Sequence, residues 1–330
     1  MGAGQSFEQG SRAGQLAIIT GGAAGIGFGA AEKAMWLGMT TVVADIEPTA
    51  LADAVRRLQA GCEGGNACTG VVVDVSDEAS VQALAAHPAV AGSAIRFLFL
   101  NAGVHNGEAS FEATAADFRW LLSVNVEGVA HGLRTFTPKM LAQAERCAIC
   151  TTSSAAGINT TQTGPYSISK TAVRVLTEQL YHDVAANGGD HIQVHCLFPA
   201  FVVSDLTWSE RNRPDGLLDD GEGRVNSGGR ELTDEGMRRG KEKLSRPDYM
   251  QQMNAETPAE MATTLMQGVA DNRFYVLGGK DGGSSIRESA ARRADAIVND
   301  LPPPFGGGFS SDANKEKFAK LQQKDVQPKL

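Results

Sequence analysis

Short apolar runs alternate with helical patterns of apolar residues from residue 14 to about residue 200. The runs show little polar alternation, which predicts strands that are buried on both faces. Between them, apolar residues recur at the spacing of a helix face. The pattern therefore predicts an α/β fold, in which a parallel sheet carries helices on both faces. We expect strands over residues 16–19, 40–44, 71–73, 95–100, 148–152 and 192–197, and helices over 50–58, 81–86, 115–142 and 166–185.

The pattern changes after residue 206. Residues 209–250 are rich in Gly, Arg, Asp and Glu and poor in large apolar residues, which predicts a mobile substrate loop or lid, partly disordered. A helical pattern returns at 258–270, a strand-like run follows at 274–277, and 284–298 is again helical. We expect one catalytic domain over 14–280 that contains the lid as an insertion. The flanking segments are a flexible leader, 1–13, and a helical or irregular C-terminal extension, 281–330.

The first apolar run ends in a glycine-dense turn, Thr20-Gly21-Gly22-Ala23-Ala24-Gly25-Ile26-Gly27, and a helical pattern of apolar residues follows it. Glycine lets the backbone turn sharply and approach a ligand closely. The N-terminus of a helix supplies N–H donors and a partial positive charge. A strand, this turn and a helix in that order predict a binding pocket for a diphosphate, although an ordinary tight turn has the same pattern.

Composition excludes several classes of function. The 330 residues are 42% hydrophobic and 21% charged, as in an ordinary globular protein. A net charge of -8 argues against an extended nucleic-acid surface. No apolar run approaches the roughly 20 residues needed to span a bilayer. Residues 1–6 fit the loose pattern for myristoylation of Gly2, but no basic patch follows, so we expect a cytoplasmic protein without membrane or nucleic-acid partners.

The five cysteines do not indicate a metal site. Cys147 and Cys150 form a CxxC pair within a strand-like run, where positions three apart point to opposite faces. We therefore expect buried free thiols and no bound metal.

Further motifs follow the glycine turn in a fixed order, namely Asp74-Val75, Asn101-Ala102-Gly103, Asn125, Ser153-Ser154, Tyr166 with Lys170, and Pro199-Ala200 with Ser204. Together the set resembles the non-extended type of the short-chain dehydrogenase/reductase family over about residues 14–205. The resemblance implies a Rossmann-like doubly wound sheet and hydride transfer between a nicotinamide cofactor and a secondary alcohol or ketone. Residues 268–276 are similar to a branch with aryl-alcohol dehydrogenases, which favours an apolar or aromatic substrate.

Asp45 predicts which dinucleotide binds. It ends the second strand, eighteen residues after Gly27, where an acid accepts hydrogen bonds from the adenosine ribose. A carboxylate there repels the extra phosphate of NADP, by about 4 kcal/mol at 4 Å and an effective dielectric of 20. No Arg or Lys lies within residues 21–27, and Ile46 follows Asp45. NAD is therefore preferred over NADP, unless Asp45 only caps the next helix.

The resemblance assigns other residues to the cofactor. Asp74 and Val75 contact adenine, with a helix cap as the alternative role for Asp74. The small residues after the 95–100 strand permit close approach of the cofactor and also stabilise the sheet. Ser204 offers a hydroxyl to the carboxamide. The full expected set is Gly21, Gly25, Ile26, Gly27, Asp45, Asp74, Val75, Asn101, Ala102, Gly103, Tyr166, Lys170, Pro199, Val202 and Ser204.

Tyr166 and Lys170 lie four residues apart in a predicted helix and so share one face. A free tyrosine has a pKa near 10, and lowering it by two units takes about 2.7 kcal/mol. A nearby ammonium and an oxidised nicotinamide favour the phenolate. Tyr166 is the expected general acid and base, and Lys170 also holds the nicotinamide ribose.

Two further catalytic residues are expected. The Ser-Ser-Ala-Ala-Gly order selects Ser154 as the donor to the substrate oxygen, although the usual family spacing of thirteen residues before the tyrosine selects Ser153. By resemblance, Asn125 holds a water that links Lys170 to solvent. A buried, hydrogen-bonded structural role is the alternative for Asn125.

The expected substrate pocket contains His105, Phe201 and Trp208, together with residues 158–163. Phe201 and Trp208 have packing at a hinge as their alternative role. His195 lies in a strand-like run and is expected to be structural.

Three other functions fit the sequence less well than a catalytic dehydrogenase. A non-catalytic NAD-binding sensor or scaffold module has no need of the serine, tyrosine, lysine and asparagine together. A sugar-nucleotide epimerase or dehydratase has a shorter glycine spacing. A phosphate-loop NTPase is excluded because no Gly-Lys-Ser/Thr closes the turn. By resemblance, the helices at 115–142 and 166–185 pair copies of the chain into a homodimer or homotetramer.

Overall fold

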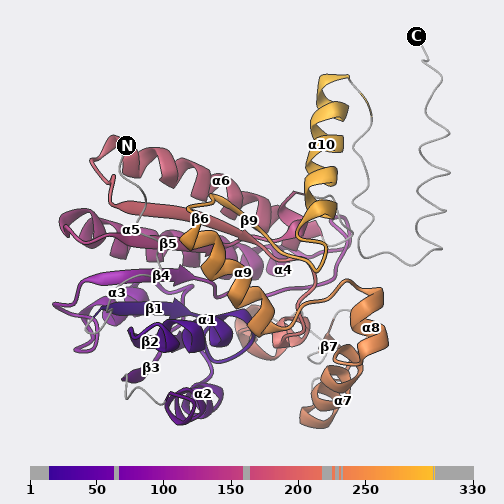
Figure 1. Ribbon diagram of the computed structural model, residues 1–330. Helices are drawn as coiled ribbons and strands as arrows, with labels where there is room; N and C mark the ends of the chain where they lie inside the picture. Colours follow the sequence, from indigo (N-terminus) through magenta and orange to yellow (C-terminus); the bar gives the residue numbers. More distant parts are fainter. Residues whose placement is uncertain are drawn as a thin grey trace.

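The centre of the computed structural model is a parallel sheet of seven strands in the order β3-β2-β1-β4-β5-β6-β9 (Figure 1). The structure describes residues 15–62, 67–158, 164–217, 225–226, 230–231, 233–299 and 301. The order reverses between β1 and β4, and ligands of such sheets bind at the carboxyl ends of the strands beside that point. The strands are β1 Leu16–Thr20, β2 Thr40–Asp45, β3 Cys68–Val72, β4 Ile95–Leu100, β5 Cys147–Thr152, β6 Ile192–Phe198 and β9 Tyr275–Leu277.

Helices cover both faces of this sheet, as the sequence predicts. Neighbouring strand residues point to opposite faces, so Ile19 packs with one helical layer and Ile18 with the other. The first layer contains α1 Gly25–Trp36, α2 Pro48–Ala60 and α9 Pro258–Ala270. The second contains α3 Glu78–Ala86, α5 Gly128–Ala142 and α6 Gly164–Ala186. The Rossmann-like fold expected from the resemblance is thereby confirmed.

The helix predicted over 115–142 is interrupted. It consists of α4 Ala115–Leu122, a π-helical turn Ser123–Glu127 and α5. Asn125 sits inside the π turn, fully buried, where its side chain bonds to the backbone of Val104. An extra residue per turn is typical of functional sites, and apolar periodicity does not reveal it.

The segment predicted as a lid is partly helical in its described part. It contains 3-10 turns at Asp205–Asn212 and Asp215–Leu217, α7 Asp234–Leu244 and α8 Pro247–Gln252, with a short hairpin of β7 Val225–Asn226 and β8 Arg230–Glu231. Thr233 caps α7 through the backbone N–H of Gly236, and Pro247 opens α8. The many charged residues of α7 hide its short apolar face from a periodicity argument.

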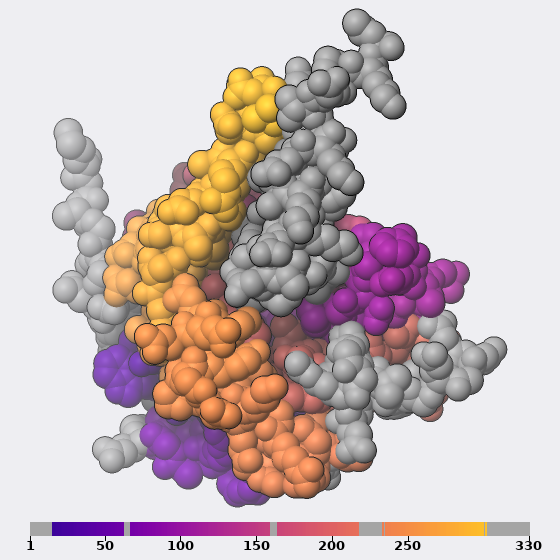
Figure 2. Space-filling view, turned by 90° about the vertical axis from the view of Figure 1, so that its right-hand side faces the viewer, coloured from indigo at the N-terminus to yellow at the C-terminus, as the bar shows by residue number. Residues whose placement is uncertain are grey.

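The helix predicted at 284–298 is present as α10 Ser284–Val298. It begins after Gly283, whose φ of 81° suits a glycine. In Figure 1 α10 extends away from the sheet, and in Figure 2 it rises in yellow beyond the orange helices of residues 234–270. The predicted leader and the predicted irregular end of the C-terminal extension, from residue 302, lie outside the described residues. Within the described ranges, every helix lacks the length or apolar character that crossing a bilayer requires.

All five cysteines are free thiols, as expected, and Cys147 and Cys150 are buried. Burial raises the pKa of Cys147 to about 12, which keeps it protonated and unreactive. His195 is also buried in β6, where Nδ1 lies 2.7 Å from the carbonyl oxygen of Arg273. Its Nε2 has no hydrogen-bond partner. His195 is therefore a structural residue, as expected, but only one of its two ring nitrogens is hydrogen-bonded.

Candidate active site

A cleft of about 560 Å³ opens at the carboxyl ends of the strands. This volume lies in the range of small-molecule and cofactor sites. Five of the predicted site residues do not line it: Gly27, His105, Asn125, Phe201 and Trp208. The structure brings the others together on its walls, namely Gly21, Gly25, Ile26, Asp45, Asp74, Val75, Asn101, Ala102, Gly103, Ser154, Tyr166, Lys170, Pro199, Val202 and Ser204.

The glycine turn has the shape that close approach of a diphosphate requires. Gly21 and Gly25 have φ values of 62° and 55°, a region that favours glycine. A Cβ on Gly27 would lie 2.1 Å from the carbonyl oxygen of Gly21, so only glycine fits there. No side chain caps the N-terminus of α1, and its first residues line the cleft. The first-turn N–H groups are therefore placed to receive an anion.

Asp45 joins the second strand to the glycine turn. Its Oδ2 accepts a hydrogen bond from the backbone N–H of Ala23 at 3.0 Å, and its Oδ1 accepts one from Glu47 at 3.2 Å. Burial raises the pKa of the Asp45 carboxyl, and the backbone hydrogen bonds oppose that rise. The N-cap position of α2 is Glu47, so the helix-cap alternative for Asp45 is not what the structure shows.

Asp74 likewise lines the cleft without capping α3. Its Oδ1 accepts hydrogen bonds from the backbone and hydroxyl of Ser76, at 2.9 and 2.6 Å. The cap of α3 is Asp77, which accepts from the N–H of Ala79. The cap alternative for Asp74 therefore does not hold, and its carboxyl remains at the cleft wall.

Asn101 ties three strands together beneath the cleft. Its Nδ2 donates to the carbonyl oxygens of Thr20 and Gly21, at 3.2 and 3.1 Å, and its Oδ1 accepts from the Thr152 hydroxyl at 3.0 Å. This small-residue segment stabilises the sheet, as the sequence analysis expects. At Gly103, a Cβ would lie 3.2 Å from Nζ of Lys170, so a larger residue would crowd the lysine.

The phenol of Tyr166, the ammonium of Lys170 and the hydroxyl of Ser154 meet at the cleft wall. Ser154 lies close enough to the Tyr166 phenol to oppose the rise in its pKa. Lys170 lies with Nζ 5.7 Å from the centre of the Tyr166 ring and donates to the carbonyl oxygen of Thr152 at 2.9 Å. In contrast, Ser153 donates to the backbone carbonyl of Lys170 at 2.7 Å. This geometry favours Ser154 over Ser153 as the substrate-oxygen donor.

Burial dominates the electrostatics of this group. It raises the pKa of Tyr166 to about 12, with the Ser154 hydrogen bond opposing the rise. Burial also lowers the pKa of Lys170 to about 8. In the protein alone the pKa of Tyr166 is thus raised rather than lowered as the sequence predicts, because desolvation outweighs the opposing hydrogen bond from Ser154. Lowering it would depend on a bound cationic nicotinamide.

Asn125 lies behind Lys170 rather than on the cleft wall. Its Oδ1 accepts from the N–H of Val104 at 2.8 Å, and its Nδ2 donates to the carbonyl of Val104 and to the hydroxyl of Ser169, both at 2.9 Å. The side chain is therefore fully engaged within the protein, as in the structural alternative. If Asn125 holds a water of a proton relay, only its backbone is available to do so.

The family model of the short chain dehydrogenases matches residues 15–215 of this chain. The protein is a short-chain dehydrogenase/reductase. It is 31% identical over 292 residues to the C alpha-dehydrogenase of Sphingobium sp., covering 88% of this chain and 87% of that protein. It is 30% identical over 205 residues to the galactitol 2-dehydrogenase (L-tagatose-forming) of Cereibacter sphaeroides, with 61% and 77% covered.

A solved short-chain dehydrogenase/reductase from Burkholderia phymatum, in complex with NAD, is similar in structure as well. The two chains share 35% identity and a TM-score of 0.75, and the match covers 90% of this chain and 98% of that one. The similarity therefore extends well beyond the dinucleotide motif.

The expected substrate residues of this dehydrogenase lie behind the cleft wall. His105 packs edge-on against the Tyr166 ring at 4.6 Å between ring centres. Phe201 contacts the Tyr249 ring at 6.3 Å. Trp208 is buried beside α7, where a Cβ on Gly240 would lie 2.2 Å from its ring. The packing alternative holds for Phe201 and Trp208, and residues 159–163 lie outside the described residues.

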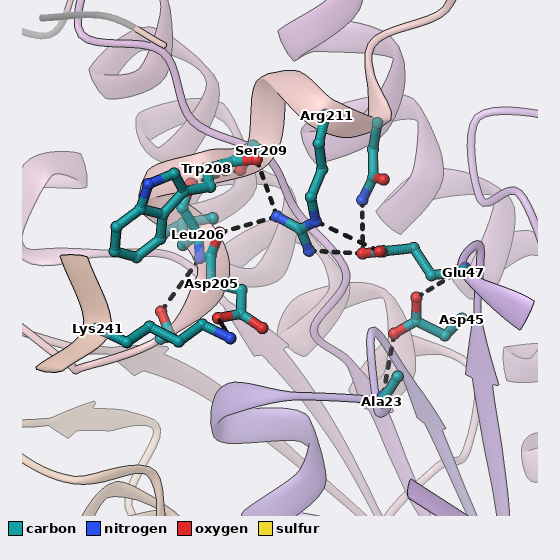
Figure 3. A network of polar contacts seen from close by, with 11 residues as sticks. Ala23, Asp45, Glu47, Asp205, Leu206, Trp208, Ser209, Arg211 and Lys241 are labelled. Carbon is teal, nitrogen blue, oxygen red and sulfur yellow. Dashed lines mark hydrogen bonds and ion pairs between the residues drawn. The ribbon is translucent and has the colours of Figure 1, made fainter. Parts of the chain in front are cut away.

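Other residues line the cleft that the sequence analysis did not identify. Near Tyr166 the wall is apolar and is formed by Val104, Trp120, Val124 and Leu206. Elsewhere the wall is charged, with Glu47, Asp205, Arg211 and Lys241 on it (Figure 3).

Burial alone would raise the pKa of Glu47, but hydrogen bonds from Arg211 and Asn212 hold it below its ordinary value. The sequence could have indicated Glu47 as a cleft residue, because it lies two residues after Asp45 in the same loop. It could not have indicated Arg211, because nothing in the charged pattern of the lid distinguishes one basic residue from another.

Proposed function

We propose that this chain is an NAD-dependent oxidoreductase that interconverts a secondary alcohol and a ketone. The observation that carries the proposal is the meeting of Ser154, Tyr166 and Lys170 at the wall of a cleft that begins in a glycine turn. Bound NAD supplies the hydride acceptor, and NADH the hydride donor. Ser154 holds the substrate oxygen by a hydrogen bond. Tyr166 takes the hydroxyl proton during oxidation and returns it during reduction.

Lys170 has two roles in this proposal. Its Nζ lies near the Tyr166 ring, so its positive charge favours the phenolate that forms as the alcohol proton leaves. The same ammonium, at the cleft wall, would bind the hydroxyls of the nicotinamide ribose. The pKa of about 8 leaves Lys170 mostly protonated at neutral pH, as both roles require.

The preference for NAD rests on Asp45. Its carboxylate is half-buried on the cleft wall and is fixed by the N–H groups of Ala23 and Glu47. Two ribose hydroxyls can still donate to it, since a carboxylate has about four acceptor positions. A 2′-phosphate in the same place would meet a negative charge.

The substrate is proposed to be apolar or aromatic beside its reacting carbon. Val104, Trp120, Val124 and Leu206 form the wall next to Tyr166. An aliphatic polyol would leave its hydroxyls against this wall without partners.

We further propose that the protein is a cytoplasmic homodimer or homotetramer. The supporting observation is an apolar stripe on α6, where Ile168 and Val175 are 47% and 50% exposed. These residues are seven apart and so lie on one face of the helix. Light scattering that shows only monomer would contradict this assembly.

A panel of secondary alcohols and ketones, followed by NADH absorbance with each dinucleotide, tests the function. We expect turnover with NAD and aryl-substituted alcohols, and slower turnover with polyols of similar size. Binding of NADH without turnover of any alcohol or ketone would indicate the sensor or scaffold alternative instead.

A further inference from the structure

An ion pair spans the mouth of the cleft between segments 164 residues apart in the chain. The guanidinium of Arg211, in the lid, donates to the carboxylate of Glu47 from Nη2 at 2.5 Å and from Nε at 3.3 Å. Asn212 adds a hydrogen bond to the same carboxylate at 2.9 Å. Glu47 lies in the loop after β2, two residues from Asp45, and Figure 3 shows the two carboxylates beside one another.

The rest of Arg211 is held by the lid itself. Its Nη1 donates to the backbone carbonyls of Asp205 and Trp208, at 3.0 and 2.9 Å. These two bonds do not involve Glu47, so they would keep the guanidinium at the cleft mouth if Glu47 were removed. The edge formed by Nε and Nη2 would then face the cleft without its carboxylate.

The charges around this end of the cleft are unequal. Four carboxylates line it, those of Asp45, Glu47, Asp74 and Asp205. The basic residues on the same wall are Arg211 and Lys241, and each forms an ion pair, Arg211 with Glu47 and Lys241 with Asp205. An additional phosphate on the adenosine ribose would therefore enter an acidic region whose cations are already paired.

We propose that Glu47 is a specificity-determining residue that selects NAD over NADP by holding Arg211 in this ion pair. The inference rests on the proposed use of a nicotinamide dinucleotide. The N–H fork of arginine matches a phosphate as well as it matches a carboxylate. With Glu47 in place, Arg211 is occupied and the ribose meets the acid of Asp45. Without Glu47, the same fork becomes a phosphate-binding group beside the ribose.

The test is the binding of NADH and NADPH to the full chain without substrate, measured by fluorescence titration. Glu47→Ala should raise the affinity for NADPH relative to NADH at least tenfold, or about 1.4 kcal/mol. The double variant Glu47→Ala/Arg211→Met should return the ratio to within about twofold of the wild type. Asn212→Ala is the matched control, because it removes a lid contact to Glu47 without changing charge, and its ratio should stay at the wild-type value.

Three results would overturn the inference. An unchanged ratio in Glu47→Ala shows that Glu47 does not select the cofactor. A gain that persists in the double variant shows that Glu47 repels phosphate directly, without Arg211. An equal gain in Asn212→Ala shows that loosening the lid is sufficient.

If Glu47→Ala does not fold, Glu47→Gln replaces it. The amide has the length of the carboxylate but no charge, so it should release Arg211 and raise the affinity for NADPH relative to NADH several-fold, and Glu47→Gln/Arg211→Met should remove that gain. An unchanged ratio in Glu47→Gln would refute the proposal. Failure of the wild type to bind either dinucleotide would refute the proposed function, and this inference with it. If the wild type binds NADH but the NADPH-to-NADH affinity ratio does not change in the variants, only this inference is refuted and the proposed function stands.

Discussion

Replacing Lys170 by Met should stabilise the protein at neutral pH while removing its activity. Lys170 is 3% exposed, and burial lowers the pKa of its ammonium from 10.5 to about 8. At 1.36 kcal/mol for each pKa unit, keeping this side chain charged at pH 7 costs about 3 kcal/mol of folding free energy. Methionine has similar length and needs no such solvation.

The gain is partly offset by one lost hydrogen bond. Lys170 donates to the carbonyl oxygen of Thr152 at 2.9 Å, and leaving that acceptor without a donor costs about 1 kcal/mol. Lys170→Met is therefore expected to be more stable than the wild type by about 2 kcal/mol at pH 7. Catalysis falls because no ammonium then stands beside Tyr166, a trade of stability against activity.

The pH dependence gives the sharper test. The folded chain loses the Lys170 proton near pH 8, whereas the unfolded chain keeps it until about pH 10.5. The unfolded state binds more protons in this interval, so the stability of the wild type rises with pH relative to the variant. The advantage of Lys170→Met should disappear between pH 8 and pH 10.5.

Urea unfolding of both proteins without cofactor, at several pH values from 7 to 10, measures this difference. Lys139→Met is a control, because Lys139 is exposed and its ammonium bonds to the carbonyl of Ala85 outside the cleft. A difference between Lys170→Met and wild type that is independent of pH would refute the reasoning. So would a variant that is less stable at pH 7.

Three further predictions follow from the site and the lid. Ser154→Ala should lower kcat by about 10²–10³ with little change in melting temperature, whereas Ser153→Ala should mainly cost about 1–3 kcal/mol of stability; equal kinetic effects would contradict the assignment. At Gly27 a methyl group would lie 2.1 Å from a backbone carbonyl oxygen, so Gly27→Ala should weaken NADH binding in calorimetry at least tenfold; normal affinity would show that the turn can yield. Arg213→Met should cost about 3–5 kcal/mol in urea unfolding, because Arg213 and its partner Asp117 are both buried, 2.7 Å apart; a neutral effect would show that the pair contributes little.

Much of the fold follows from local patterns in the sequence. Ile18 and Ile19 are both apolar because the sheet is covered on both faces, and that pattern predicts the two helical layers. The spacing of Tyr166 and Lys170 predicts that they share a helix face, and both line the cleft. These features depend on periods of two and 3.6 residues, which a sequence displays directly.

Other features depend on contacts between distant segments. The π turn around Asn125 arises from its bonds to the backbone of Val104, twenty-one residues away. The pairing of Glu47 with Arg211 joins the first βα units to the lid. The raised pKa of Tyr166 reflects how much water the whole fold removes, a quantity that the neighbouring charge alone does not predict.

The central claim is that the Tyr166 phenol carries the proton while a dinucleotide is bound in the cleft. Tyr166→Phe removes the hydroxyl and keeps the ring that packs against His105. Turnover and the dissociation constant for NADH should be measured on the same preparation. We predict a loss of turnover of at least 10²-fold with NADH affinity within about twofold of the wild type. A variant that binds NADH normally and keeps more than about a tenth of the wild-type rate would contradict the account.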